Sequence, residues 1–331
     1  MIDFREIIGH EKPITILKNR IKYNKVGQAY LFAGKDGIGK KSVAIAFSKA
    51  INCKNLSNEQ NPCNKCSACL TIEKGTNPDV DIISPVDSVI KIEKIRELKS
   101  NIFYQPIENK KKVYIIDEAD KMTLEASNSL LKVLEEPPGY AVLVLITAFP
   151  DSILPTILSR CCKLSFKPLS NRQQLEILLR QKELNLDEKQ LKEIIKLSYG
   201  SPGIVMQRIA DKQKITLQKT YIKQIAQLRP VDMLDCIFNP ENYFPEINDN
   251  FLYFVEVMIL WFRDILYLKK DMNIKYLVFQ EEINAIKRYA QYYSENNLMN
   301  ILEYLSIIPE ELKRHINKNT LLENFFIRLG D

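Results

Sequence analysis

The sequence predicts an α/β domain built around a parallel sheet, followed by a small helical unit and a longer all-helical region. A glycine-rich loop stands between a short apolar run, 29–33, and a helical segment. Two further runs, 113–116 and 141–146, are apolar without interruption, which suits parallel strands covered by helices on both faces. After Pro168 this strand signal disappears and apolar residues recur at helical spacing.

The elements of the α/β domain follow from these runs. Ala29 to Ala33 reads as a strand, and Lys40 to Ala50 reads as a helix with its small and apolar residues on one side. Thr123 to Glu136 is a second helical segment, which Pro137-Pro138-Gly139 ends. We therefore predict strand, loop and helix in the order that a phosphate-binding loop requires.

The chain is long enough for several domains, each with its own core. We predict an α/β domain over 1–168, a small helical domain over 169–211 and an all-helical domain over 212–331. The longest apolar stretch, 251–268, contains Glu256, Arg263 and Asp264, so we expect a buried helix and no membrane span.

Composition fits a globular protein of a reducing compartment. The 47 basic and 41 acidic residues give a net charge of +6, an excess that suits solubility as well as contact with nucleic acid. The first residues lack the basic start and apolar run of a secretory signal, so we expect a cytoplasmic protein. In such a compartment seven cysteines favour metal binding or free thiols over disulfides.

The loop from Gly34 to Ser42 has the spacing of a phosphate-binding P-loop, except at one position. Gly34, Gly37 and Gly39 let backbone N–H groups turn toward phosphate oxygens, and Lys40 supplies a positive charge. The next position normally carries a hydroxyl that ligates Mg²⁺, but here it is Lys41. Ser42 is a poor substitute because it lies about 100° further around the helix. The loop is suited to phosphate and impaired for catalysis.

A second phosphate-site element ends the predicted strand 113–116. Asp117 is placed to hold Mg²⁺ through water, and Glu118 to polarise an attacking water. The alternative is a helix N-cap after a strand. The letters DEAD at 117–120 invite comparison with helicases, but the chain lacks a second α/β domain.

Four cysteines, spaced C-x9-C-x2-C-x2-C, follow the first helix. Thiolate-only ligation without an open position is typical of a structural zinc site. The ligands would be Cys53, Cys63, Cys66 and Cys69. The alternative is four reduced thiols. Metal catalysis is not expected because no histidine is near in the sequence, and we expect His10 to be a surface or packing residue.

A third element, Ser159-Arg160-Cys161, follows the strand 141–147. A guanidinium at the edge of a sheet can act on the γ-phosphate of a neighbouring subunit, where it accelerates transfer by about 10³–10⁵. Taken alone, an exposed arginine is ordinary surface, so this element gains weight only beside the other two.

Together these motifs resemble the bacterial clamp-loader branch of the AAA+ family. Ser159-Arg160-Cys161 matches its SRC arginine-finger motif, residues 117–120 match its Walker B motif, and the four cysteines match its zinc insertion. Thr147 falls where the sensor-1 polar residue is expected. The resemblance implies an AAA+ domain, a helical lid and a helical collar, and it covers residues 1–210 with specific motifs.

Two departures indicate the type of subunit. Lys41 replaces the Mg²⁺-ligating hydroxyl, and Gly203 stands where an active subunit carries its sensor-2 arginine. The chain is therefore similar to the delta-prime type, a rigid stator in this family. The resemblance implies no ATPase activity of the chain alone, weak or absent binding of ATP or ADP, a structural zinc ion, and an arginine finger, Arg160, that acts in trans.

The resemblance also implies partners. These are gamma/tau and delta subunits in a hetero-pentamer within the DNA polymerase III holoenzyme, and through that complex the sliding clamp and primed DNA. Two alternatives remain open at this point. One is a catalytic gamma/tau-type ATPase subunit, which shares the zinc and SRC motifs, and the other is a zinc-bearing DNA adaptor that works outside any ring.

Overall fold

The computed structural model divides into two compact units, Met1–Val205 and Met206–Asp331. It describes residues 1–181, 188–196, 198–228, 236, 240–244, 246–247, 249–314 and 316–329. The helical spacing of apolar residues in the sequence also predicts a helix over 187–197, and both of its end residues lie outside the described ones. The first unit carries the sheet and the predicted site residues, and the second consists of helices.

A five-stranded parallel sheet forms the centre of the first unit. Its strands are β1 (Ala29–Ala33), β2 (Val80–Ile83), β3 (Lys112–Ile116), β4 (Ala141–Thr147) and β5 (Cys162–Ser165), in the spatial order β2-β3-β4-β1-β5. All four pairings are parallel. Every residue of β1, β3 and β4 is buried, as expected of strands covered on both faces.

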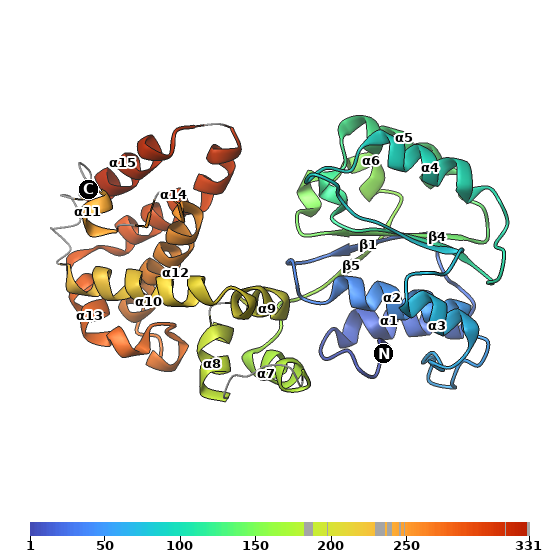
Figure 1. Cartoon of the computed structure of the whole chain (residues 1–331), viewed down its shortest axis with the longest axis horizontal. Coiled ribbons are helices and arrows are strands. Elements are labelled where there is room, and N and C mark those ends of the chain that lie inside the picture. The colour runs from blue at the N-terminus through green and yellow to red at the C-terminus, as the bar shows by residue number, and fades with distance from the viewer. Residues whose placement is uncertain are drawn as a thin grey trace. The chain divides into compact units, whose positions relative to one another are not determined.

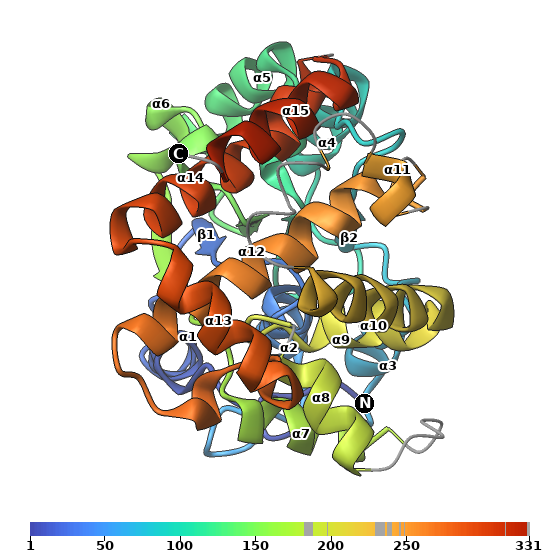
Figure 2. The same ribbon diagram turned by 90° about the vertical axis from the view of Figure 1, so that its left-hand side faces the viewer.

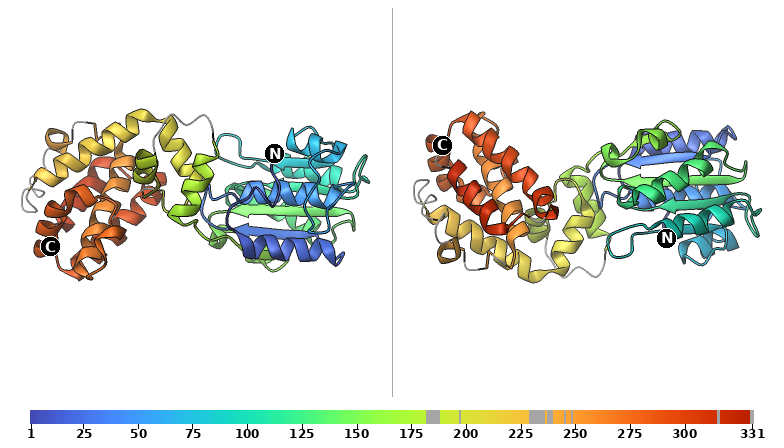
Figure 3. Two further views of the ribbon diagram at one scale, coloured as in Figure 1. Left: turned by 90° about the horizontal axis from the view of Figure 1, so that it is seen from below. Right: turned by 90° about the horizontal axis from the view of Figure 1, so that it is seen from above.

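Helices cover both faces of this sheet (Figure 1, Figure 3). On one face lie α1 (Glu11–Lys22), α2 (Lys40–Asn52) and α3 (Ser67–Glu73), and on the other α4 (Ile92–Ile102), α5 (Leu124–Glu135) and α6 (Pro155–Leu158). Successive residues of a strand point to opposite faces. Phe32 therefore packs in the core beneath α2, whereas Leu31 packs in the core beneath α5.

A small helical segment completes the first unit. It comprises α7 (Asn171–Leu179), α8 (Glu188–Lys196) and the start of α9 (Pro202–Ala210). Ser170 and Gln173 form a capping box that starts α7. The turn before α9 brings this segment against the glycine loop.

The second unit is all-helical in its described residues. Its helices are α10 (Lys212–Gln227), α11 (Pro240–Tyr243), α12 (Phe251–Lys269), α13 (Ile283–Tyr292), α14 (Glu295–Lys313) and α15 (Lys318–Arg328). Helix α12 contacts α10, α13 and α14 (Figure 2). Its Phe254, Trp261 and Phe262 are fully buried, which confirms the predicted buried helix. Among the described residues, no helix has the length and apolar character that a bilayer span needs.

Candidate functional site

The parallel sheet brings the predicted phosphate-site elements to one edge. In the strand register Ala33 lies beside Thr147, so the glycine loop after β1 begins next to the end of β4. The Gly34 N–H donates to the Thr147 carbonyl at 3.1 Å. Asp117 follows β3 at the same edge, where its N–H donates to the Ile83 carbonyl at 2.8 Å. Ligand sites of open α/β sheets occur at this edge.

Lys41 and Asp117 meet at the centre of this site. The Lys41 ammonium lies 3.0 Å from Oδ2 of Asp117. Lys41 occupies the first turn of α2, whose N-cap is Gly39 with a φ of 104°. Ser42 follows as a half-buried residue of the same turn. The position of the missing metal-binding hydroxyl therefore holds a cation that already pairs with the carboxylate predicted to hold Mg²⁺.

The side chain of Lys40 turns back onto its own loop. Its ammonium donates to the carbonyl of Gly34 and, at 2.6 Å, to that of Lys35. Asp36 Oδ1 lies 3.7 Å away. Burial lowers the pKa of Lys40, while the carboxylates of Asp36 and Asp117 counteract that shift. The lysine is thus satisfied by protein acceptors inside the loop.

Glu118 and Thr147 also have partners within the chain. Glu118, whose φ is 51°, forms an ion pair with Lys121. The buried Thr147 hydroxyl donates to Asp120 Oδ1 at 2.5 Å and accepts the Phe149 N–H at 2.9 Å. With the contacts of Lys40 and the Lys41–Asp117 pair, most of the polar side chains predicted for this edge therefore have a partner within the chain.

The turn before α9 closes against the glycine loop. The Ser201 hydroxyl donates to the Asp36 carbonyl at 2.7 Å, and the Gly203 N–H donates to the Gly37 carbonyl at 2.9 Å. A Cβ atom at Gly203 would lie 2.7 Å from Cα of Gly37, closer than van der Waals contact permits. The site of the expected sensor-2 arginine thus has no room for any side chain while the loop keeps this position.

His10 is a packing residue, which is one of the two roles expected from the sequence. It is buried and stacks edge-on against Phe166 with the ring centroids 5.0 Å apart. Its Nε2 lies 2.7 Å from the carbonyl of Ile38 in the glycine loop. Burial lowers the pKa of His10, although the bond to Ile38 opposes the shift. The neutral ring with Nε2–H as donor fits this contact.

Arg160 lies on the short connection between α6 and β5. One terminal guanidinium nitrogen donates to the Thr156 carbonyl at 2.9 Å and to the Ser159 hydroxyl at 3.4 Å, and the other donates to Glu135 Oε1 at 3.0 Å. About a third of its side chain, 36%, is exposed. The guanidinium therefore keeps N–H donors that a further partner can reach.

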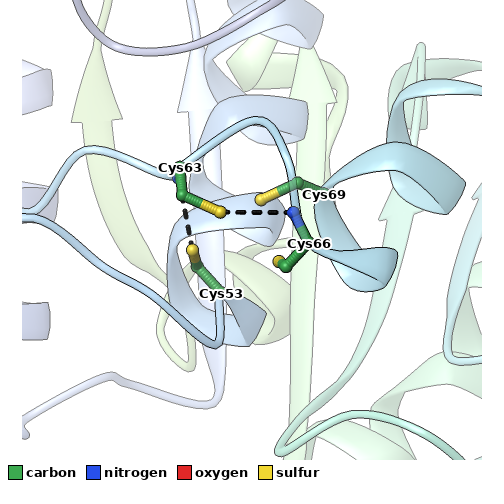
Figure 4. A group of neighbouring side chains, drawn as sticks. All are labelled: Cys53, Cys63, Cys66 and Cys69. Atoms are coloured by element: carbon green, nitrogen blue, oxygen red, sulfur yellow. Dashed lines mark hydrogen bonds between the residues drawn. The ribbon is translucent and has the colours of Figure 1, made fainter.

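The four predicted metal ligands form one cluster (Figure 4). Their sulfur atoms all lie within 4.8 Å of one another. Zinc–sulfur bonds of about 2.3 Å would place the sulfurs of a tetrahedral site about 3.8 Å apart, so the cluster needs only a small contraction. The N–H groups of Cys63 and Cys66 donate to the sulfurs of Cys53 and Cys63 at 3.2 and 3.3 Å. Such a donor set can hold a metal ion such as zinc.

The thiols of this cluster do not ionise alike. Burial raises the pKa of Cys69 and of Cys53. Burial opposes ionisation of Cys63 as well, but N–H donors from Lys65 and Cys66 and neighbouring thiols lower its pKa to about 6. Four thiolates at this separation repel one another, so full ionisation requires a bound cation.

No sequence motif predicts several of the contacts in the site. The bond from Ser201 to Asp36 joins residues 165 positions apart, and the Arg160 to Glu135 pair joins residues 25 apart. The pairing of Lys41 with Asp117, by contrast, can be predicted from the motifs. Both motif positions normally face the same metal ion, so a lysine at one of them predicts a contact with the carboxylate at the other.

Two family models match the chain. The one described as "DNA polymerase III, delta subunit" matches residues 9–170, and the one described as "DNA polymerase III, delta subunit, C terminal" matches residues 242–331. Together they include most of both units.

The curated relatives include delta' as well as tau/gamma subunits of DNA polymerase III. The chain is 28% identical to DNA polymerase III subunit delta' of Bacillus subtilis, with 96% of this chain and 95% of that protein covered. It is 38% identical to subunit tau/gamma of Haemophilus influenzae over 201 residues, which is 60% of this chain but only 29% of that longer protein. Among solved structures, a gamma subunit-related protein of Thermotoga maritima is 20% identical, covers 96% of this chain and 98% of its own, and gives a TM-score of 0.43.

Proposed function

This chain belongs to the family of DNA polymerase III delta-type clamp-loader subunits, and we propose that it is the delta-prime member of its loader. In this role it helps to load the sliding clamp onto primed DNA. It donates Arg160 in trans to the ATP site of a neighbouring subunit and does not hydrolyse ATP itself. The full-length match to subunit delta' supports this choice.

The observation that carries the proposal is the ion pair between Lys41 and Asp117 at 3.0 Å. ATP hydrolysis at a P-loop needs Mg²⁺ to bridge the phosphates and neutralise developing charge. An ammonium cannot ligate a cation, and here it also occupies the carboxylate that a Mg²⁺ ion needs. The nucleotide site of this chain, formed by Gly34, Gly37, Gly39, Lys40 and Ser42 with Glu118 and Thr147, binds ATP or ADP weakly or not at all.

The helical segment after the α/β domain supports the same conclusion. Gly203 leaves the γ-phosphate position without a sensor-2 arginine, and its N–H bonds the Gly37 carbonyl at 2.9 Å. An active site must open between these two elements to admit a triphosphate. In this chain they hold each other directly, which suits a subunit that keeps one conformation through the cycle.

Arg160 is the group that we assign to the neighbour's reaction. Its side chain is 36% exposed, and two of its five N–H donors are not used by Thr156, Ser159 and Glu135, as a finger that reaches across a subunit boundary requires. A guanidinium that stabilises charge on the transferred phosphoryl group is worth about 10³–10⁵ in rate. The acceptor site belongs to a gamma/tau subunit.

The remaining assignments follow from the family. The partners are gamma/tau and delta subunits in a hetero-pentamer, and the all-helical C-terminal domain is the collar that joins them. Cys53, Cys63, Cys66 and Cys69 hold a structural zinc ion, a role that the thiolate-only donor set supports. The loader works in the cytoplasm as a component of the DNA polymerase III holoenzyme.

Reconstitution tests the proposal. The chain is assembled with its gamma/tau and delta subunits, and DNA-stimulated ATP hydrolysis is compared for wild type, Arg160→Ala and Arg172→Ala. Arg172 is an exposed arginine of α7 and serves as the control. We expect Arg160→Ala to lower turnover steeply without preventing assembly, and Arg172→Ala to leave turnover unchanged. Unchanged turnover of the assembled Arg160→Ala loader would remove the finger role.

A catalytic gamma/tau-type subunit is the second candidate. The 38% identity to subunit tau/gamma over 201 residues and the intact Lys40 favour it. A titration of the isolated chain with ATP, with and without Mg²⁺, separates the two. A catalytic subunit should bind ATP more tightly with Mg²⁺ and hydrolyse it, whereas the delta-prime role predicts neither.

A further inference from the structure

The guanidinium of Arg160 is held by acceptors from two different helices. The Thr156 carbonyl of α6 accepts one N–H at 2.9 Å, and Glu135 Oε1 at the end of α5 accepts another at 3.0 Å. The first contact is local, four residues before the arginine. The second joins residues 25 apart and therefore depends on the fold.

Glu135 and Arg160 lie on different kinds of backbone support. Glu135 is the last residue of α5, and the C-cap Glu136 separates it from Pro137-Pro138. The preceding Val133 and Leu134 are buried against the sheet with Ile157 of α6. Arg160, by contrast, lies on a short connection between α6 and β5. The ion pair thus links Arg160, on its short connection, to the end of a helix whose preceding residues are packed in the core.

The ion pair between Arg160 and Glu135 contributes little to the stability of the fold. The two side chains are 36% and 50% exposed, and ion pairs at such positions stabilise proteins by about 0–1 kcal/mol. The pair does restrict a long side chain that otherwise samples many rotamers. Three of the five N–H donors of the guanidinium meet Thr156, Ser159 and Glu135, which leaves two for phosphate oxygens.

We propose that Glu135 is a positioning residue that preorients Arg160 for the neighbouring ATP site. This inference rests on the proposed trans role of Arg160. Glu135 touches no phosphate and acts only by limiting the orientations of the guanidinium. A finger held near its working geometry loses less conformational entropy in the transition state, so the effect falls on kcat.

The test uses the reconstituted loader with primed DNA. Steady-state kcat and KM for ATP are measured with Glu135→Ala, Glu135→Gln, Arg160→Ala and the double variant Glu135→Ala/Arg160→Ala. Glu136→Ala removes the adjacent exposed carboxylate and is the matched control. We expect Glu135→Ala to lower kcat roughly 2- to 10-fold with KM unchanged. Glu135→Gln should recover most of the loss because its amide oxygen still accepts the N–H, and Glu136→Ala should behave as wild type.

The double variant separates positioning from general damage. If Glu135 acts only through Arg160, the double variant is as slow as Arg160→Ala alone. An unchanged or raised kcat in Glu135→Ala overturns the inference, and so does a further loss in the double variant, provided that Arg160→Ala alone is slow. An Arg160→Ala loader with normal turnover contradicts the trans role itself, and the inference fails with it.

Discussion

The Lys41 ammonium lies 3.0 Å from Oδ2 of Asp117, at the position where an active P-loop site holds Mg²⁺. A single side chain thereby removes a metal ligand and neutralises a second one. Lys40, Glu118 and Thr147 are also satisfied within the chain. The site thus has the motif residues expected of a nucleotide site, but several of their polar side chains bond to other groups of the chain.

The first prediction concerns Lys41→Thr. This change frees Asp117 and restores a hydroxyl at the metal position, so Mg²⁺-dependent ATP binding should tighten by about tenfold or more. Calorimetric titration of ATP with and without Mg²⁺ measures the gain. Lys41→Met removes the charge without adding a ligand and should show no Mg²⁺ dependence. Equal Mg²⁺-dependent affinity of wild type and Lys41→Thr would contradict the role of the ion pair.

The second prediction concerns the contact between Gly203 and Gly37. In Gly203→Ala the added methyl lies 2.7 Å from Cα and 3.0 Å from the carbonyl oxygen of Gly37, so the backbone must shift. We expect the free energy of unfolding to fall by about 1–3 kcal/mol. Thermal denaturation, followed by a signal from the first unit, measures the change in the free energy of unfolding. Gly139→Ala, where no atom lies within 4 Å of the added Cβ, is the control and should not destabilise. Equal stability of the two variants would contradict the close packing of Gly203 against Gly37.

The sequence predicts the centre of the sheet better than its edges. β1, β3 and β4 coincide with apolar runs because both faces of these strands are buried. No apolar run in the sequence predicts β2 or β5. Both are four residues long and lie at the edges of the sheet, and β2 has an exposed Asp81, so neither gives an uninterrupted apolar pattern.

The candidate site shows a similar division. The motifs predict which residues gather at the sheet edge, because parallel strands end together. They do not predict the bonds from Ser201 and Gly203 to the glycine loop, since these depend on how the helical segment packs. The sequence does not predict the role of Glu135 either, because Glu135 meets Arg160 only through the packing of the ends of α5 and α6.

The third prediction concerns the cysteine cluster. The chain, purified without chelator, should contain one zinc ion, and its removal should lower the thermal stability because metal binding contributes folding free energy. Elemental analysis and thermal denaturation measure both effects. Cys66→Ser should lose most of the metal, whereas Cys161→Ser, outside the cluster, should retain it. Equal zinc content in these two variants would contradict the assigned ligands.

The fourth prediction concerns pH. Burial lowers the pKa of His10 in the folded chain below its usual value, so the unfolded chain binds more protons in the acidic range. The contribution of His10 to stability is therefore complete above pH 6.5 and is lost as the pH falls through the lowered folded pKa. Urea unfolding between pH 8 and 5 should show a smaller loss of stability for His10→Gln than for wild type. Parallel curves would exclude His10 as a source of the pH dependence.

The most direct test is the structure of the assembled loader with a transition-state analogue such as ADP–aluminium fluoride. The measured quantity is the distance from the Arg160 guanidinium to the fluoride atoms in the neighbouring gamma/tau site. We predict hydrogen-bond distance there, with no nucleotide in the pocket of this chain and Lys41 still on Asp117. A guanidinium that faces solvent, or a Mg²⁺–nucleotide held by Asp117, would contradict the account.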